Sequence, residues 1–152
     1  MTPRSICLLC HNVRSLWNVG SFFRTADAFA VERIFLTGYT GKPPRKEITK
    51  TAIGAEAFVA WEHHSDPLPV LERLHRDGWQ IVALELTPQA MPMDDFHPGG
   101  RVCLVVGHEL EGVPQDILAQ SDAVIAIPML GQKESLNVAV AAGIALHHLR
   151  RR

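Results

Sequence analysis

Short, continuous apolar runs alternate with longer stretches of helical periodicity along the chain. Such runs predict strands that are buried on both faces of a sheet. They occupy residues 5–10, 32–37, 58–61, 80–84, 101–106 and 123–127. Helices are expected at 18–30, 67–75 and 135–149. This alternation favours an α/β fold with a mostly parallel sheet and helices on both faces. No repeat or long linker divides the sequence, so we expect one domain over residues 1–152.

The composition is that of an ordinary globular protein, with 47% apolar and 20% charged residues. No apolar run approaches the roughly 20 residues that a membrane-spanning helix needs. The apolar run that follows Ser5 is too short for a signal peptide. We therefore expect a cytoplasmic protein that is not inserted in a membrane.

The cysteines and histidines do not predict a metal site. Cys7 and Cys10 form a C-x-x-C motif, but no second C-x-x-C and no spaced histidine pair accompanies it. Inside an apolar strand cysteine behaves as a small hydrophobic residue, and Cys103 is interpreted in the same way. The pairs His63-His64 and His147-His148 are adjacent in sequence and do not share a face. We expect no bound metal.

Basic residues are gathered locally, although the formal net charge is only −1. One cluster begins in a glycine- and proline-containing loop that follows the second predicted strand, and the other closes the chain. The members are Lys42, Arg45, Lys46 and Lys50, and the arginines at 150–152. Local clusters of this kind can bind phosphates even on a neutral protein. A solvated loop and a frayed tail explain the same residues equally well.

Three segments combine the end of a strand, a polar or glycine-containing turn and the start of a helix. They are residues 12–27, 105–114 and 127–143. In open α/β sheets, ligands bind beyond the carboxyl ends of the strands. The first segment offers the unpaired amides of a helix start with Arg14 nearby, which suits a phosphate. Arg24 lies further along this helix, where a surface ion pair with Asp27 is the structural alternative.

The other two segments are also open to structural explanations. Gly107 directly follows a buried strand and would let a ligand approach, but a plain tight turn before Pro114 explains it as well. Ser135 or a neighbour could simply cap the last helix. Asn137 is harder to explain, because an amide among Val, Ala and Leu needs a partner if it is buried. Neither G-x-G-x-x-G nor a P-loop occurs, which counts against a Rossmann dinucleotide site and a nucleotidase.

The three segments together resemble the SpoU/TrmH family of SPOUT methyltransferases. Its three motifs are matched, in order, by N-V-G-S-F-F-R-T-A-D, L-V-V-G-H-E-L-E-G-V and I-P-M-L-G-Q-K-E-S-L-N-V-A-V-A-A-G. The resemblance implies an α/β knot fold, in which the C-terminal part is threaded into a deep trefoil knot. It also implies a homodimer that binds S-adenosyl-L-methionine. The second motif differs from the family at His108, where Asn is common.

The resemblance also implies a set of site residues. Those that match the family's functional residues are Asn18, Arg24, Glu109, Ser135 and Asn137. Those around the cofactor are Leu86, Gly107, Ile127, Met129 and Leu136. For RNA contact we expect Arg14, Lys42, Arg45 and Lys46, with the C-terminal arginines as further candidates.

The function implied is transfer of a methyl group from S-adenosyl-L-methionine to a ribose 2′-hydroxyl of RNA. Transfer RNA is the favoured substrate and ribosomal RNA the second. We expect no separate RNA-binding extension, so RNA would be held by this domain, by its dimer partner or by an auxiliary protein. Two alternatives are methylation of an RNA base by the same fold, and an RNA-binding module that has lost catalysis. A guanidinium is too basic for an ordinary general base, so Arg24 is expected to engage a phosphate or the ribose oxygen and stabilise negative charge.

Overall fold

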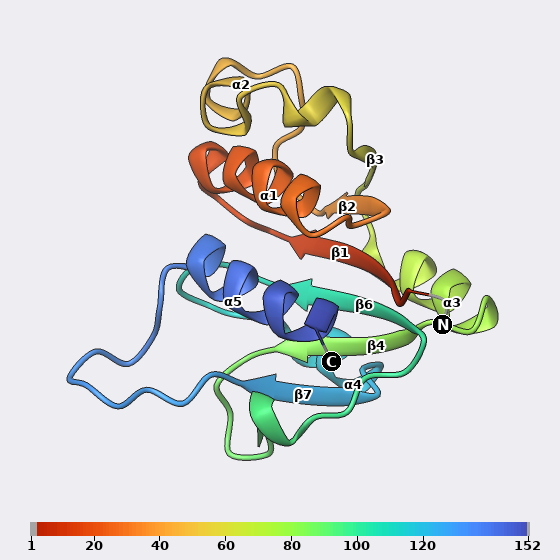
Figure 1. Cartoon of the computed structure of the whole chain (residues 1–152), viewed down its shortest axis with the longest axis vertical. Coiled ribbons are helices and arrows are strands. Elements are labelled where there is room, and N and C mark those ends of the chain that lie inside the picture. The colour runs from red at the N-terminus through yellow and green to blue at the C-terminus, as the bar shows by residue number, and fades with distance from the viewer. Residues whose placement is uncertain (1–2, 152) are drawn as a thin grey trace.

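The core of the molecule is a seven-stranded sheet in which all neighbouring strands are parallel (Figure 1). The computed structural model describes residues 3–151. The strand order is β3-β2-β1-β6-β4-β7-β5. The bounds are β1 (Ser5–His11), β2 (Arg33–Thr37), β3 (Ala60–His64), β4 (Gln80–Leu84), β5 (Met91–Pro92), β6 (Arg101–Val106) and β7 (Ala123–Ala126). The expected parallel sheet is confirmed.

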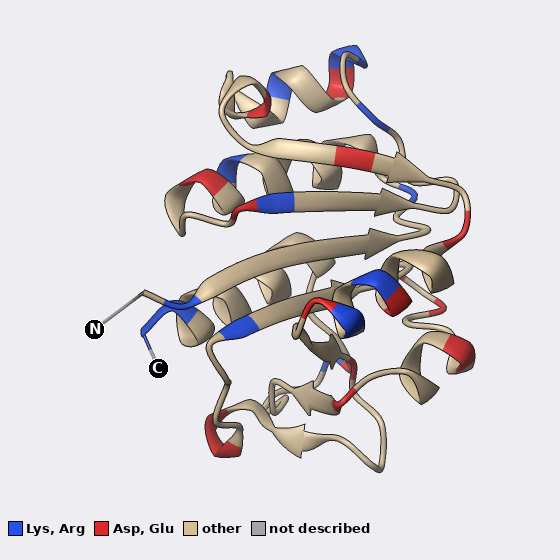
Figure 2. Ribbon diagram, turned by 90° about the vertical axis from the view of Figure 1, so that its right-hand side faces the viewer, with Lys and Arg blue, Asp and Glu red and all other residues tan. Residues whose placement is uncertain are grey.

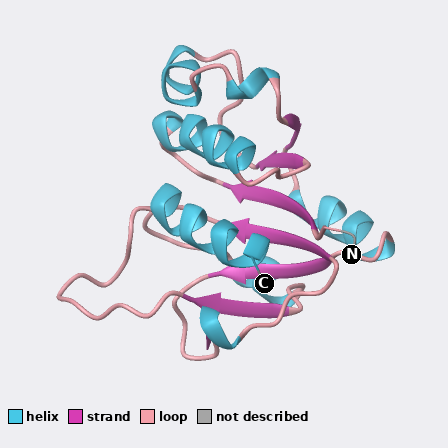
Figure 3. Ribbon diagram, viewed as in Figure 1, coloured by secondary structure: helices cyan, strands magenta, loops and turns pink. Residues whose placement is uncertain are grey.

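Helices cover both faces of this sheet, as expected (Figure 3). One face carries α1 (Leu16–Ala28) and α5 (Val138–Arg151), and α2 (Lys46–Ala52) packs on α1. The other face carries α3 (Pro67–Arg76) and α4 (Gln115–Ala119). Two short 3-10 turns, η1 (Ala55–Ala57) and η2 (Met93–Asp95), lie in the connections.

Alternate residues of each central strand feed two separate apolar layers, because successive side chains of a strand point to opposite faces. In β1, Leu8 and Cys10 join the α1/α5 layer, and Cys7 and Leu9 join the α3/α4 layer. The C-x-x-C cysteines therefore lie on opposite faces of the sheet. All three thiols are free and buried, and burial raises the pKa of Cys7 to about 12. Their interpretation as core residues is confirmed.

Most predicted elements are present, with shifted ends. The strand expected at 58–61 lies at Ala60–His64 instead, because Phe58 ends η1 and is 80% exposed. The first helix begins at Leu16 rather than at 18, because the Ser15 side chain accepts a hydrogen bond from the Asn18 amide. The third helix begins as expected, where Asp66 caps it.

The start of the last helix was predicted wrongly. α5 begins at Val138, not at 135, and Ser135 does not cap it. The cap is Asn137, whose side-chain oxygen accepts from the amides of Ala139 (2.8 Å) and Val140 (3.3 Å). Residues 127–137 form a long loop that extends beyond the sheet (Figure 1). None of the helices in residues 3–151 is long and apolar enough to span a membrane.

Candidate active site

A cavity of about 360 Å³ lies at the carboxyl ends of β4, β6 and β7. Its walls come from residues 84–86 after β4, from the 106–112 segment after β6, and from the 126–141 segment that connects β7 to α5. All five residues expected around the cofactor line it: Leu86, Gly107, Ile127, Met129 and Leu136. Parallel strands of an open sheet end together at this edge, which is where ligands bind in such folds.

One wall of the cavity is a tight turn that follows β6, residues 107–113, which we call the glycine turn. An antiparallel bridge between His108 and Gly112 closes it. A Cβ on Gly107 would lie 2.5 Å from the Gly112 carbonyl oxygen, and Gly112 has a positive φ of 74°. Both positions therefore require glycine. His108 Nδ1 accepts hydrogen bonds from the amides of Leu110 and Glu111, at 3.0 Å each.

Glu109 projects from the glycine turn to the start of α1. Its two carboxylate oxygens accept from the amides of Arg14 (2.9 Å) and Ser15 (2.8 Å) and from the side-chain amide of Asn18 (3.2 Å). Partial burial acts to raise the pKa of Glu109, but these hydrogen bonds stabilise the ionised form, and the pKa lies below its ordinary value. The carboxylate of Glu109 thus binds at the start of α1, where we expected a phosphate to bind.

The start of α5 meets the same cluster. The Asn137 side-chain amide donates to the Asn18 side-chain oxygen at 3.4 Å, while its own oxygen caps α5. Asn137 stands directly before α5 rather than within the helix as expected, and it is exposed, so its side-chain amide is not a buried group. Asn18, Glu109 and Asn137, which are far apart in sequence, are brought together beside the cavity. Ser135 is exposed and lines the cavity from the long loop.

Arg24 lies apart from these three residues. It follows Asn18 by six positions on α1, a rise of about 9 Å along the helix axis. Its side chain is exposed and forms no hydrogen bond or ion pair with any residue in 3–151, so the alternative pairing with Asp27 does not form. The guanidinium is therefore available to a molecule that approaches α1.

The expected RNA-binding residues lie on exposed surface near α1 and α2. Arg14, Lys42, Arg45 and Lys46 are all exposed, and Arg45 approaches Glu47 at 3.8 Å. Figure 2 shows basic residues around α2 and again beside the chain ends. At the chain ends, the Arg150 guanidinium is occupied by the carbonyls of Phe29, Ala30 and Arg4. Arg152 lies outside the described residues.

Glu85 is a site residue that the sequence reasoning missed. It directly follows β4, lines the cavity, and accepts from the Val113 amide at 2.7 Å. The available signal was an acidic residue immediately after an apolar strand, at the edge of the sheet where ligands bind.

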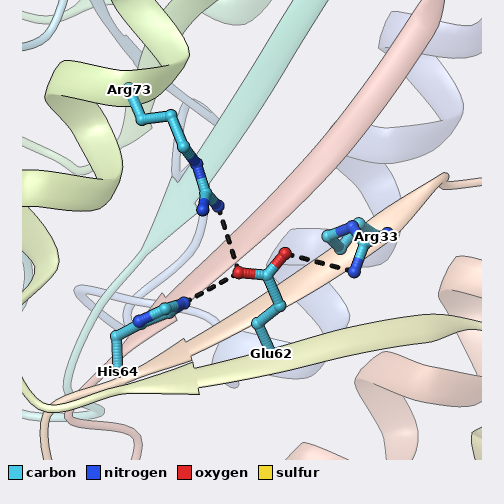
Figure 4. Close-up of polar contacts among 4 residues, drawn as sticks. All are labelled: Arg33, Glu62, His64 and Arg73. Atoms are coloured by element: carbon cyan, nitrogen blue, oxygen red, sulfur yellow. Dashed lines mark hydrogen bonds and ion pairs between the residues drawn. The ribbon is translucent and has the colours of Figure 1, made fainter.

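A second polar cluster lies at the far edge of the sheet, around Glu62 on β3 (Figure 4). Its carboxylate contacts His64 at 2.8 Å, Arg73 at 3.1 Å and Arg33 at 3.1 Å. Partial burial acts to raise the pKa of Glu62, but the hydrogen bonds from His64 and Arg73 lower it below its ordinary value. The cluster ties α3 to β2 and β3, three strands away from the cavity. No group of three or more His, Cys, Asp or Glu within residues 3–151 is placed to hold a metal ion.

The chain is similar in sequence and in structure to known RNA methyltransferases. The chain is 32% identical over 150 residues to the tRNA (guanosine(18)-2′-O)-methyltransferase of Aquifex aeolicus, a match that covers 97% of this chain and 70% of that protein. It superposes on the AdoMet-bound rRNA methyltransferase from Sinorhizobium meliloti with a TM-score of 0.91 and 28% identity, over 99% of this chain and 57% of that one.

A third relative is close to this chain in length. It is the subject of a structure concerned with 2-OH methylation of C/U34 on tRNA, with a TM-score of 0.88 and 25% identity, over 99% of this chain and 97% of that one. This chain therefore spans between 57% and 97% of these relatives. The model of the SpoU rRNA methylase family matches residues 5–147. Because that match takes in the glycine turn, the long loop and the start of α1, which together build the cavity and its polar cluster, the chain belongs to the SpoU rRNA methylase family.

Proposed function

We propose that this protein transfers a methyl group from S-adenosyl-L-methionine to a ribose 2′-hydroxyl of RNA, with tRNA as the favoured substrate and rRNA as the second. The observation that carries the proposal is the cavity itself, because all five expected cofactor positions line it and the Asn18–Glu109–Asn137 cluster borders it. The relatives named for 2′-O-methylation of tRNA and for an AdoMet-bound rRNA methyltransferase support the same reaction.

The chemistry of the cavity fits this cofactor. Its volume is in the range of small-molecule sites. Three carboxylates line it (Glu85, Glu109 and Glu134), and no Lys or Arg among the described residues does. The lack of a basic side chain disfavours the phosphates of a dinucleotide, and the exposed carboxylate of Glu134, which is not bound to an amide as those of Glu85 and Glu109 are, suits a sulfonium cation. Leu86, Gly107, Ile127, Met129 and Leu136 would hold the cofactor, which supplies a methyl group already activated for transfer.

The protein must then orient the acceptor and stabilise the charge that develops on it. Arg24 is proposed to bind an RNA phosphate or the ribose oxygen, since its guanidinium is exposed and without a partner in residues 3–151. Ser135 and Asn137 would hold the ribose or the long loop in register. Asn18 and Glu109 act as positioning residues, because their polar groups are already used to fix the start of α1. Arg14, Lys42, Arg45 and Lys46 would contact phosphates.

The direct test is to incubate the purified protein with methyl-labelled S-adenosyl-L-methionine and total small RNA from cells that lack it. Nucleoside digestion then identifies the labelled position. We expect label in a 2′-O-methyl nucleoside, lost in Arg24→Ala while calorimetric cofactor binding persists. The control is Arg76→Ala, which should keep activity, because Arg76 is exposed and lies outside the cavity and its polar cluster. Label in a base would establish base methylation instead. Cofactor binding with no label in any RNA, including after addition of cell extract as a source of an auxiliary protein, would favour a binding module.

We further propose a homodimer that uses the groove between α1 and α5. Half of the residues that line this groove are small or apolar, namely Phe29, Ala139, Val140, Gly143 and Ile144, and the other half are polar. Val140 and Ile144 are 53% and 39% exposed, which is unusual for the apolar face of a helix. Light scattering should give twice the mass of the chain, and Ile144→Arg should give the monomer mass. A monomeric wild type would contradict this.

A deep trefoil knot is proposed for the C-terminal part. After β7, near the edge of the sheet, α5 returns to pack on β6 and also contacts η2. His148 Nδ1 of α5 lies 3.9 Å from Asp94 Oδ1 of η2, so the 85–100 connection borders the last helix. A crystal structure traced through this connection tests the threading.

We also propose that the protein is cytoplasmic, which the three free thiols support.

A further inference from the structure

We propose that Glu85 is a positioning residue that fixes the glycine turn and thereby sets the shape of the cofactor cavity. The inference rests on the proposed function, because the cavity is taken to be the S-adenosyl-L-methionine site. Neither the family motifs nor the cofactor positions named above include Glu85.

Both carboxylate oxygens of Glu85 bind main-chain amides rather than pointing to solvent. Oε2 accepts from Val113 at 2.7 Å, and Oε1 accepts from Leu86, the next residue in the chain, at 3.1 Å. Hydrogen bonds to an ionised acceptor are about twice as strong as neutral ones. The carboxylate therefore joins the end of β4 to the last residue of the glycine turn, across the cavity wall.

The backbone of the glycine turn lies directly against this carboxylate. A Cβ on Gly112 would lie 2.0 Å from Glu85 Oε2, so no side chain fits between them. Gly112 is bridged to His108, and its carbonyl lies against Gly107. A displacement of Glu85 would consequently move residues 107–112 as a unit, and all of these residues except Glu111 line the cavity.

The glycine turn has a second attachment. Glu109 within it holds the start of α1 through the amides of Arg14 and Ser15 and through Asn18. Glu85 and Glu109 thus fix the turn at two points, one to β4 and the other to α1.

The test compares Glu85→Gln with Glu111→Gln. The glutamine is nearly isosteric, but its NH₂ group would face one of the two amides that the carboxylate now accepts. Glu111 lies in the same turn, is exposed, and its side chain forms no hydrogen bond or ion pair with any residue in 3–151, so Glu111→Gln removes a charge of the same sign without breaking such a bond. Calorimetry measures binding of S-adenosylmethionine and of its neutral product, S-adenosylhomocysteine, to each protein without RNA. Amide hydrogen exchange at Val113 reports the bond itself.

We expect Glu85→Gln to weaken both ligands by a similar factor of about ten or more, and to speed exchange of the Val113 amide. In turnover, KM for S-adenosylmethionine should rise with kcat nearly unchanged. Glu111→Gln should match the wild type within about twofold in every measurement. Gly112→Ala, which presses on the same contact from the other side, should reproduce the Glu85→Gln affinity loss.

Three outcomes would overturn the inference. Wild-type affinity for both ligands in Glu85→Gln would show that the bond does not shape the cavity. Loss of affinity for the cationic cofactor alone would show that Glu85 acts through its charge on the ligand. Unchanged exchange at Val113 would show that the bond is not formed in solution. If the wild type itself binds neither ligand, the proposed function fails. That failure differs from a failure of the Glu85 inference, in which the wild type binds both ligands and Glu85→Gln does so equally well.

Discussion

At the residue scale, His108 stabilises the glycine turn through one of its ring nitrogens. Nδ1 accepts from the amides of Leu110 and Glu111, so the ring satisfies two main-chain donors of the glycine turn. An asparagine side-chain oxygen can accept from amides two and three residues on in the same manner. The departure from the common family residue therefore replaces one acceptor with another, and the local hydrogen bonds are preserved.

His108→Asn should accordingly keep both stability and cofactor affinity close to the wild type. His108→Leu removes the acceptor and leaves two amides without a protein partner, and should lower the free energy of unfolding by about 1–2 kcal/mol. Urea unfolding with calorimetric binding measures both. Equal losses in the two variants would mean that the ring is needed for its shape, for instance its edge-on contact with Tyr39.

Glu109 predicts a dependence of stability on pH. Because its pKa in the folded protein lies below the ordinary value of 4.5, its contribution is present above that pH and is lost as pH falls through the lowered pKa. The difference in unfolding free energy between wild type and Glu109→Gln should therefore be largest near neutral pH and shrink below about pH 4.5. Urea unfolding at a series of pH values measures it. A difference that stays constant with pH would contradict the assignment. The pKa of Glu62 is also lowered, but Glu62 is present in both proteins, so its contribution cancels in the difference.

At the scale of elements, α1 and α2 approach each other closely at Gly20. A Cβ on Gly20 would lie 1.8 Å from Thr51 Oγ1 and 2.3 Å from the Ile48 carbonyl oxygen, so the helices touch backbone to backbone there. The pattern of apolar residues predicted α1 but not this contact, because a glycine in a helix gives no periodic signal.

Gly20→Ala should therefore destabilise the protein, although alanine is the better helix former by about 1 kcal/mol. Overpacking costs about 1–3 kcal/mol in general, and the carbonyl of Ile48 cannot rotate away as a side chain could. We expect a net loss of about 1–2 kcal/mol in urea unfolding. Asp27→Ala, at an exposed position of the same helix, serves as the control and should change stability by less than about 0.5 kcal/mol. A more stable Gly20→Ala would mean that α2 moves freely.

Elements were predictable where burial alone decides them. β4 and β6 lie at the residues expected, because each is a continuous apolar run bounded by polar or glycine residues. The start of α5 was not, because Ser135 and Asn137 are both good caps and the choice depends on where the long loop leaves β7. Likewise, the five positions proposed to hold the cofactor could be identified from the family motifs, and they line the cavity, whereas the Glu85–Val113 bond spans 28 positions and has no local pattern.

At the scale of the whole molecule, protection from solvent should grade across the sheet. β1 and β6 lie in its middle, are paired on both sides, and are buried on both faces. β3 and β5 are the edge strands, and neither has a buried residue. Local opening costs least where few apolar contacts are lost.

Hydrogen–deuterium exchange should therefore be slowest in β1 and β6 and fastest in β5 and β3. Glu62→Gln, which loosens the ties of α3 to β2 and β3, should speed exchange in β3 and leave β6 unchanged. Mass spectrometry of peptic fragments measures this. Uniform exchange across the sheet would indicate that it opens only as a whole.

The two ends of the described chain are joined by hydrogen bonds. Arg150 donates to the Arg4 carbonyl, and Arg4 donates to the Leu149 carbonyl, so the first strand and last helix are joined by a pair of reciprocal bonds. They meet where the strands begin, and the cavity lies where the strands end. A fluorescent protein or an affinity handle fused at either end would thus leave the cavity mouth unobstructed. The two ends could also be joined by a short peptide, so that new ends are opened in an exposed loop and the site is kept intact.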